Sequence, residues 1–498
     1  DLNSKIILSG KAAASSETLS YFSYLINNQE KLKIILPVIN SSNPNSYAAR
    51  TIYDTSHFYP SSKDLTIKVH YSKPVSRSVG YLDFYTLNFT RDLAFIGGQM
   101  DFRDLRTASQ ELVSQYTLTK ANNNVKIWNI SDPLNIKQVQ ASLNGTQLTF
   151  TLASDSIQEF IAFDGSSYYS AQFVSKVANQ NLHGVASHEM ILITPAAFRD
   201  QADRLADFHR DFDDMSVFVV EPELIYNEFS SGAQDVTAIR NFLKMLYDRS
   251  EPGEEPRYLL LFGDASYDPK DRIDNNTNFI PAWESPQSLN PISSYVNDDY
   301  YGMLDDEGDS MLDIGIGRMV VSSSEQAKKM VDKVIRYAVK TSENMGDWRN
   351  IVCLVADDED NNLHYNQAEQ LAQMLDTVNK NLNIEKIYLD AYQQKSTASG
   401  ARYPEVTRDL TTRNERGALI VNYTGHGGEG GLAHERILKT TDINEWRNPD
   451  NMPVFITATC EFSRFDDPGR VSAGELVFLN EHGGGIAFIK PDIVHETR

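Results

Sequence analysis

The sequence predicts a multidomain protein, with a β-rich, sandwich-like N-terminal region followed by an α/β domain whose sheet is mostly parallel. Apolar residues alternate in about the first 180 residues, and apolar runs alternate with amphipathic segments from about residue 184 onward. The length of 498 residues suits two to four compact domains. We expect a boundary between residues 1–183 and 184–498, and a division of the second part into 184–340 and 345–498.

The composition is that of a folded protein with an acidic surface. Hydrophobic residues make up 41 % of the chain, and 46 Lys and Arg oppose 68 Asp and Glu, which gives a formal net charge of −22. An acidic surface repels phosphate backbones, so the composition disfavours nucleic-acid binding. No apolar run of the sequence approaches the roughly 20 residues of a membrane-spanning helix.

The N-terminal region has the pattern of strands with one buried face. Apolar side chains alternate over residues 65–71 and again at Leu82 and Phe84. Asn144 and Gly145 separate two apolar runs and predict a hairpin, because both residues tolerate a positive φ. A barrel fits the pattern as well, and we take a sandwich as the prediction.

The second part has the pattern of alternating strands and helices. Asp235 is the expected N-cap of one helix, and Ser322 with Glu325 forms an expected capping box for another. The run RYLLLF is apolar throughout, as in parallel strands that are buried on both faces. The same alternation is repeated from IVCLVADD to GGGIAFI. This arrangement predicts a doubly wound domain with its ligand site beyond the carboxyl ends of the strands.

Two strands of the second series end in reactive side chains. ALIVNYT is followed by Gly425-His426-Gly427-Gly428, and VFITAT is followed by Cys460. If these strands are neighbours, about 4.8 Å apart, an imidazole and a thiol leave the same sheet edge, and the imidazolium can stabilise a nucleophilic thiolate. Backbone N–H groups of Gly427, Gly428 and Cys460 are candidates for an oxyanion hole.

Each of these features also has a plainer interpretation. A histidine in a glycine turn can simply cap the turn, and a cysteine after a strand can be structural. The occurrence of both at successive strand ends favours a cysteine nucleophile. The other cysteine, Cys353, lies in the apolar run IVCLVAD and is expected to be buried.

Several motifs around these two residues resemble the gingipain-like cysteine peptidases, peptidase family C25. They are NYTGHGGEGGL, FITATCEFSRFDDP and SAGELVFLNEHGGGIAFI, and the resemblance extends upstream through ILITPAAFRDQADRLADFHR and DIGIGRMVVSSSEQA. It implies a caspase-like fold, with His426 as general acid/base and Cys460 as nucleophile.

Within this family the chain is most similar to the sortases of the type IX secretion system of Bacteroidetes. This likeness implies a place on the outer face of the outer membrane beside a PorV-like barrel protein. It also implies removal of the C-terminal signal domain from secreted cargo and attachment of the cargo to anionic lipopolysaccharide through an acyl-enzyme. The alternatives are a secreted gingipain-like protease of broad action and an inactive docking scaffold with a peptidase fold.

Further residues are candidates for the same site. Asp298 in VNDDYYG matches the acid that lines the primary pocket of arginine-specific relatives, although a solvated turn acid or cation ligand fits it equally. The same relatives use an upstream acid to orient the histidine, and Glu284 is the nearest candidate for that role, at a spacing that departs from theirs. Asp264, at a strand end, and His434, after the glycine loop, are expected to line the cleft.

The sequence predicts no required cofactor. DDEDNN (357–362) and LDDEGDS (304–310) are oxygen-rich like calcium loops but lack EF-hand spacing, so solvated acidic loops are favoured and a structural calcium ion stays an alternative. The histidines form no HExxH pattern, which disfavours a catalytic zinc. After GGGIAFI the chain departs from the family pattern, and we expect an incomplete C-terminal end there.

Overall fold

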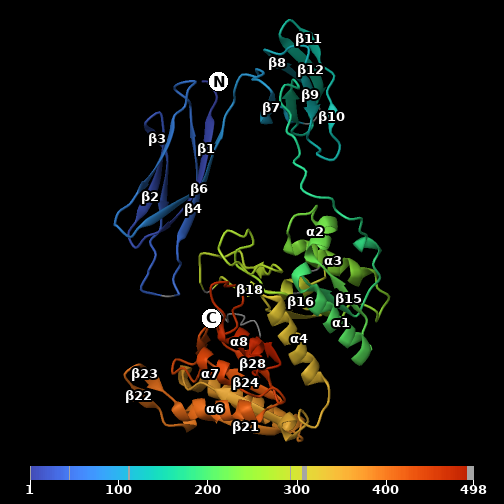
Figure 1. Cartoon of the computed structure of the whole chain (residues 1–498). Coiled ribbons are helices and arrows are strands. Elements are labelled where there is room, and N and C mark those ends of the chain that lie inside the picture. The colour runs from blue at the N-terminus through green and yellow to red at the C-terminus, as the bar shows by residue number, and fades with distance from the viewer. Residues whose placement is uncertain (1, 44, 110–112, 292, 306–310, 491–498) are drawn as a thin grey trace. The chain divides into compact units, whose positions relative to one another are not determined.

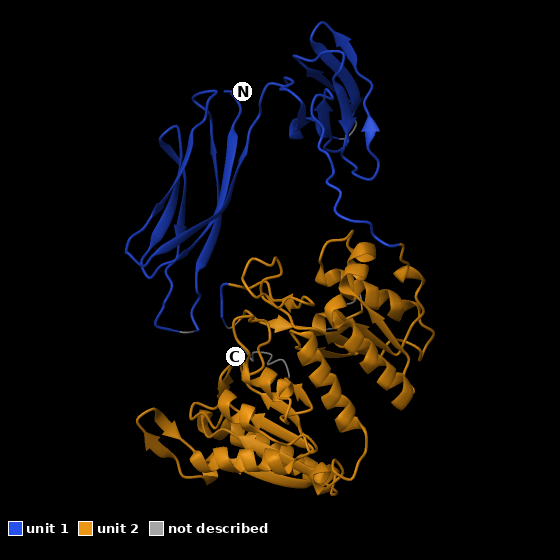
Figure 2. Cartoon of the chain, viewed as in Figure 1, with its two compact units in different colours: residues 1–178, 289–292 blue, residues 179–288, 293–498 orange. Residues whose placement is uncertain are grey.

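The computed structural model describes residues 2–43, 45–109, 113–291, 293–305 and 311–490 (Figure 1). Most of the second candidate calcium loop, at 306–310, and the chain after residue 490 therefore lie outside the described residues. The chain forms two compact units, residues 1–178 with 289–292 and residues 179–288 with 293–498 (Figure 2). Among the described helices, none has the length and apolar character needed to cross a membrane.

The first unit contains two groups of antiparallel strands, each with its own core. The first group is β1 (Ile6–Ser15), β2 (Ser20–Ile26), β3 (Gln29–Leu36), β4 (Arg50–Phe58), β5 (Ile67–Ser72) and β6 (Val79–Asn88). Its sheets β4-β1-β6 and β3-β2-β5 enclose a core that includes Leu8, Tyr24 and Ile34. This group supports the predicted sandwich.

The second group is β7 (Gln99–Arg103), β8 (Val113–Leu118), β9 (Lys126–Asn129), β10 (Lys137–Gln138), β11 (Ser142–Asn144), β12 (Gln147–Ala153) and β13 (Glu159–Phe163). Its sheets are β10-β9-β13-β7 and β11-β12-β8, and Tyr116, Phe150 and Phe160 pack in its core. The predicted hairpin is present: Asn144 lies opposite Gln147, and Gly145 has a φ of 61°. The prediction of a β-rich N-terminal region is confirmed.

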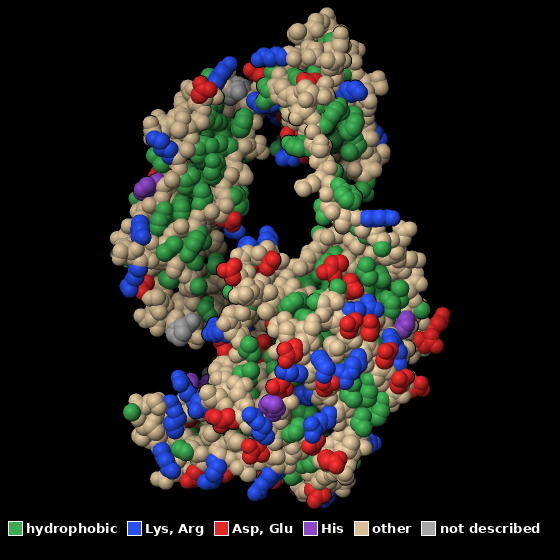
Figure 3. Space-filling view, viewed as in Figure 1, with side chains coloured by type: hydrophobic (Ala, Val, Ile, Leu, Met, Phe, Trp, Pro, Cys, Tyr) green, Lys and Arg blue, Asp and Glu red, His purple; other side chains and the backbone are tan. Residues whose placement is uncertain are grey.

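One expectation for this unit is wrong. Leu82 and Phe84, on β6, are 42 % and 41 % exposed. The pairing of β1 with β6 shifts register between Lys11, opposite Phe84, and Ala12, opposite Leu82, so that Asp83 is an extra residue. This bulge breaks the alternation on which the expectation was based. Figure 3 shows hydrophobic side chains on the surface of this strand group.

The second unit begins with a four-stranded parallel sheet in the order β15-β14-β16-β19. Its strands are β14 (Met190–Ile193), β15 (Val217–Val220), β16 (Tyr258–Phe262) and β19 (Gly315–Met319), and its helices are α1 (Arg199–Phe212), α2 (Pro222–Phe229), α3 (Val236–Arg249) and α4 (Ser324–Ala338). Leu205 of α1 and Met330 of α4 share one core, and Ile225 of α2 and Phe242 of α3 share the other. The sheet is therefore covered on both faces.

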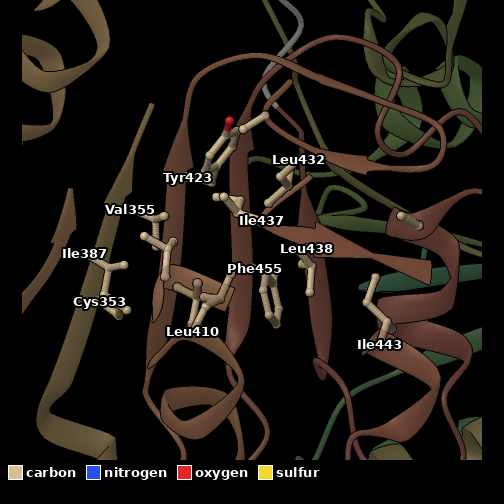
Figure 4. Close-up of a cluster of buried hydrophobic side chains, with 14 of the residues drawn as sticks. Cys353, Val355, Ile387, Leu410, Tyr423, Leu432, Ile437, Leu438, Ile443 and Phe455 are labelled. Atoms are coloured by element: carbon tan, nitrogen blue, oxygen red, sulfur yellow. The ribbon is translucent and has the colours of Figure 1, made fainter. Parts of the chain in front are cut away.

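A second parallel sheet follows in the order β21-β20-β24-β28-β29. Its strands are β20 (Ile351–Ala356), β21 (Asn383–Tyr388), β24 (Ile420–Thr424), β28 (Val454–Ala458) and β29 (Ala487–Ile489), with helices α5 (Leu363–Val378), α6 (Pro404–Arg416), α7 (Thr440–Glu445) and α8 (Ala473–Leu479). Figure 4 shows part of its core, in which Cys353, Tyr423 and Phe455 lie together with Leu410 of α6. The predicted α/β architecture with parallel sheets is confirmed.

Short hairpins and turns complete the unit. The strands are β17 (Trp283–Glu284) with β18 (Val296–Asn297), β22 (Lys395–Thr397) with β23 (Gly400–Arg402), and β25 (Gly427–Gly428) with β26 (Gly431–Leu432) and β27 (Leu438–Lys439). The described part of this unit has six 3₁₀ turns, Leu182–Gly184, Ala196–Phe198, Asp299–Gly302, Asp347–Asn350, Asp360–Asn362 and Leu389–Ala391, and one further turn, Leu105–Thr107, lies in the first unit.

The structure also tests the predicted helix starts. Asp235 caps α3, since its side chain accepts a hydrogen bond from the Thr237 N–H. The cap of α4 is Ser323, one residue later than predicted, and it accepts from the Gln326 N–H. Ser322 instead donates its own N–H to the Gln326 side chain at 2.8 Å. The Gln326 side chain thus bonds the residue before the cap, so the reciprocal bonding of the predicted capping box is not formed.

Candidate active site

His426 and Cys460 follow two strands that are direct neighbours in the second parallel sheet. Thr424, the last residue of β24, lies opposite Ala458, the last residue of β28, and the Gly425 N–H donates to the Ala458 carbonyl at 3.2 Å. His426 and Cys460 each come two residues after these paired ends. Because parallel strands leave a sheet at the same edge, the imidazole and the thiol belong to adjacent loops of one edge.

The backbone of His426 is fixed from both sides. Its N–H donates to the Asp357 carboxylate at 3.0 Å, and its carbonyl accepts from the Tyr423 hydroxyl at 2.6 Å and from the Ala433 N–H at 2.8 Å. Asp357 directly follows β20, the other neighbour of β24. Three adjacent strand ends therefore hold this loop.

The imidazole of His426 contacts Asp360. Nε2 of His426 lies 2.9 Å from Oδ2 of Asp360, and the same carboxylate lies 3.2 Å from Nε2 of His364 on α5. The hydrogen bond to His426, with the nearby His364 ring, keeps the pKa of Asp360 below its ordinary value, so the carboxylate stays ionised near neutral pH. Asp360, Asn361 and Asn362 all have positive φ, which Asp and Asn tolerate better than other residues with side chains.

The loop that carries Asp360 is not the solvated acidic loop that we favoured. The Asp357 carboxylate accepts from the His426 N–H. The Asp358 carboxylate accepts from the Tyr403 hydroxyl at 2.5 Å, and the Glu359 carboxylate lies 2.8 Å from Nδ1 of His434. Asp360 is not among the residues predicted to contact the histidine. A usable signal was present, because this acidic run directly follows a strand of the same series.

His434 also lies beside His426. The two rings stack with their centroids 5.1 Å apart and an interplanar angle of 14°. The hydrogen bond to Glu359 raises the pKa of His434. His434 itself is largely exposed. Of the residues expected to line the cleft, His434 is the one whose contact with the His426 ring the described structure shows.

Cys460 is exposed at the start of a tight turn. The Phe462 N–H donates to its carbonyl, and Glu461 between them has a φ of 31°. The glycine loop passes close by, since a Cβ on Gly427 would lie 2.4 Å from Oγ1 of Thr459. A side chain at position 427 would push the two loops apart. Gly427 and Gly428 form β25, which pairs with β26.

Asp298 has an internal partner. Its carboxylate is bound by both branches of the Arg318 guanidinium, at 2.6 Å from Nε and 2.7 Å from Nη2. Nη1 of Arg318 donates to the carbonyls of Gly263 and Ile280 at 2.9 Å each, and the guanidinium lies 5.2 Å from the centre of the Phe465 ring. The charge of Asp298 is thus neutralised within the protein.

Glu284 and Asp264 lie in the neighbourhood of Asp298. Burial raises the pKa of Glu284 to about 8 and that of Asp264 to about 7, and each has a buried oxygen without a hydrogen bond among the described residues. The charges that act on Glu284 are those of Asp466, Arg464 and Asp298. Within the described part of the chain, the carboxylates that lie beside the His426 ring are those of Asp360 and Glu359, at 2.9 Å and 3.7 Å from Nε2, and Glu284 forms no hydrogen bond to His426.

The difference follows from the fold. Glu284 belongs to β17, in the long insertion after β16 of the first sheet, whereas Asp360 follows β20, the direct neighbour of β24. Glu284 is the nearest match to the upstream acid of the relatives, at a spacing that departs from theirs, whereas strand order places Asp360 beside His426.

Parallel sheets covered by helices, with a cysteine and a histidine at one shared edge, are an arrangement of the caspase-like cysteine peptidases. The profile of peptidase family C25 matches residues 185–494, and the chain belongs to this family. No significant match was found among curated proteins.

The solved structures that resemble the chain include members of the same family. The crystal structure of dimeric latent PorU from Porphyromonas gingivalis is 26 % identical with a TM-score of 0.57, and the match covers 67 % of this chain and 34 % of the PorU chain. The Arg-specific cysteine proteinase gingipain R (RgpB) is 20 % identical with a TM-score of 0.47, over 61 % and 62 % of the two chains. The complex of Porphyromonas gingivalis RgpB pro- and mature domains is 19 % identical with a TM-score of 0.46, over 60 % and 63 %.

Proposed function

We propose that this chain is a PorU-type cysteine endopeptidase in which Cys460 is the nucleophile and His426 the general acid/base. The observation that carries the proposal is the register of β24 and β28. It pairs Thr424 with Ala458 and so brings His426 and Cys460 out of one sheet edge at the same level. A thiol and an imidazole on adjacent loops are the groups that an activated cysteine nucleophile requires.

The proposed reaction proceeds through an acyl-enzyme. The Cys460 thiolate attacks the carbonyl carbon of the scissile peptide, and backbone N–H groups of Cys460 and of Gly427 or Gly428 receive the oxyanion. As the tetrahedral intermediate collapses, the C–N bond breaks and His426 gives a proton to the departing amine. A thioester to Cys460 remains. The contact of Nε2 with Asp360 leaves Nδ1 of His426 to exchange that proton.

The second half of the reaction decides the outcome. When water attacks the thioester, His426 takes a proton from it and the product is a free carboxylate. When an amine attacks, the product is a new amide. We propose that the chain uses the amine route, as a sortase that removes the C-terminal signal domain of type IX secretion cargo and joins the cargo to anionic lipopolysaccharide.

The likeness to PorU supports this choice of substrate. It also supports a cell-surface, outer-membrane-associated location and a PorV-like barrel protein as partner. The chain spans about a third of the PorU chain that it matches, so substrate and partners are part of the proposal. The proposed chemistry needs no cofactor.

Incubation with a cargo protein that carries its C-terminal signal domain tests the function. We expect the wild type and a Cys353→Ala variant to release the signal domain and Cys460→Ala to leave it attached. Cys353 is the matched control, because it is the other cysteine and lies in the core. Equal processing by Cys460→Ala would refute the catalytic assignment. With an amine acceptor present, the mass of the cargo product distinguishes transfer from hydrolysis.

A further inference from the structure

Three carboxylates form a close cluster next to the His426 loop. Asp357, Asp358 and Glu435 each offer an oxygen within 4.8 Å of the others. Asp357 and Asp358 directly follow β20, and Glu435 lies between β26 and β27. The group, which we call the acidic triad, is thus assembled from two loops that are distant in sequence.

The acidic triad is largely buried and incompletely bonded. Asp357 is 0 % and Glu435 6 % exposed. The Asp358 N–H donates to Asp357 at 2.9 Å, and the Gln394 amide donates to Oε1 of Glu435, also at 2.9 Å. Two buried oxygens, Oδ1 of Asp358 and Oε2 of Glu435, have no hydrogen-bond partner among the described residues. Buried acceptors normally have a partner, so these two oxygens indicate a missing one.

The charge of the triad is not balanced by the protein. No Lys or Arg of the described residues forms an ion pair with these three carboxylates, and the hydroxyl, amide and backbone donors that reach them are neutral. The carboxylates of Glu359 and Asp390 add charge of the same sign, and His434, the titratable base that interacts with Asp357 and Glu435, is hydrogen-bonded to Glu359. Buried carboxylates in such proximity require a cation or bound protons.

We propose that the acidic triad is a binding site for a divalent calcium ion. Its ligands are carboxylate oxygens only, the set that hard cations prefer. Calcium–oxygen distances of about 2.3–2.6 Å allow ligand oxygens of one ion to lie up to about 5 Å apart, which fits the spacing of the triad. Magnesium demands near-octahedral geometry and gives up its waters reluctantly, so a cluster of protein carboxylates suits it less than calcium.

The site is linked to His426 by one direct hydrogen bond and by the hydroxyl of Tyr423. Asp357 accepts the His426 N–H, and the Tyr423 hydroxyl lies 3.4 Å from Asp357 and 2.6 Å from the His426 carbonyl, to which it donates. A bound cation holds Asp357 ionised and in place, and so holds the loop. The effect of calcium on catalysis rests on the proposed function, whereas the binding itself does not.

Terbium luminescence tests the binding without any activity assay. The hydroxyls of Tyr403 and Tyr423 touch the triad carboxylates, so a terbium ion bound there should be excited by energy transfer from tyrosine. In the full chain freed of metal with EDTA and then desalted, we expect tyrosine-sensitised terbium emission that calcium displaces better than magnesium. We expect Glu435→Gln to weaken calcium binding at least tenfold. The matched control Asp376→Asn removes an exposed carboxylate on α5 and should bind as the wild type does.

A thermal melt with and without calcium provides the second readout. We expect calcium to raise the melting temperature of the wild type and of Asp376→Asn, and to raise that of Glu435→Gln much less. Absence of both emission and thermal shift in the wild type would overturn the proposal, and so would equal calcium affinity in Glu435→Gln. Binding measured in Cys460→Ala is expected to be unchanged, which separates this inference from the catalytic one.

Discussion

The ion pair between Asp298 and Arg318 predicts that Asp298 stabilises the folded protein. The sequence suggested instead that Asp298 sets substrate specificity. The Arg318 side chain is 4 % exposed and that of Asp298 13 %, and the pair is bidentate. Asp298→Asn removes the negative charge and leaves the guanidinium buried without a counterion. Removing one partner of a buried pair costs about 3–5 kcal/mol, so we expect the free energy of unfolding of this unit to fall by about that amount.

Urea unfolding followed by tryptophan fluorescence measures this effect. Trp283, Trp348 and Trp446, three of the four tryptophans, lie in the second unit and report on it. The matched control is Asp203→Asn, the same substitution in the exposed ion pair of Asp203 with Arg199, where we expect a loss of about 0.5 kcal/mol or less.

The opposite result would restore the specificity interpretation. If Asp298→Asn unfolds at the wild-type urea concentration but loses a preference for arginine before the cleaved bond, the carboxylate serves the substrate and our reasoning is refuted. A double variant with Arg318→Met should be less destabilised than the sum of the two single variants, because it removes the unpaired charge.

Three further predictions concern the candidate site and its surroundings. Iodoacetamide should modify Cys460 in folded protein and Cys353 only after denaturation, as mass spectrometry can show, because burial raises the pKa of the Cys353 thiol to about 12. Asp360→Asn should lower kcat about 10- to 100-fold with little change in KM, and Asp360→Glu should recover part of it; an unchanged kcat would contradict a role in positioning His426. Burial raises the pKa of Glu475 to about 8, so the folded chain holds a proton there that the unfolded chain releases. The contribution of this proton to the free energy of unfolding is complete below about pH 4.5 and is lost as the pH rises through 8, by at most about 1.4 kcal/mol per pH unit. Urea unfolding at several pH values should show this decline in the wild type and a flatter one in Glu475→Gln.

The sequence predicted those features that depend on local pattern. Apolar runs predicted the parallel strands. The positions of His426 and Cys460 just past two strand ends predicted that both residues leave the same edge of one sheet. Features that depend on the order of strands were not predictable in this way. Asp360 contacts His426 because β20 lies next to β24, and nothing in the sequence states that order.

Long-range pairing explains the remaining differences. Arg318 lies within the short strand β19, and no sequence pattern marks it as a partner of Asp298. Its guanidinium nevertheless neutralises the Asp298 carboxylate. Glu284 is a candidate only through the family's use of an upstream acid, whereas the contact with His426 depends on which loops share a sheet edge.

The strand order also limits how the proposed catalytic groups can interact. The acidic loop follows β20, the imidazole follows β24 and the thiol follows β28, and these three strands are consecutive in the sheet. With strands about 4.8 Å apart, the acidic loop and the thiol loop leave the sheet from strands about 10 Å apart, with the imidazole loop between them. A carboxylate on the first loop therefore acts on the thiol through the imidazole, which makes Asp360 a positioning residue for His426 and leaves proton transfer to the ring alone.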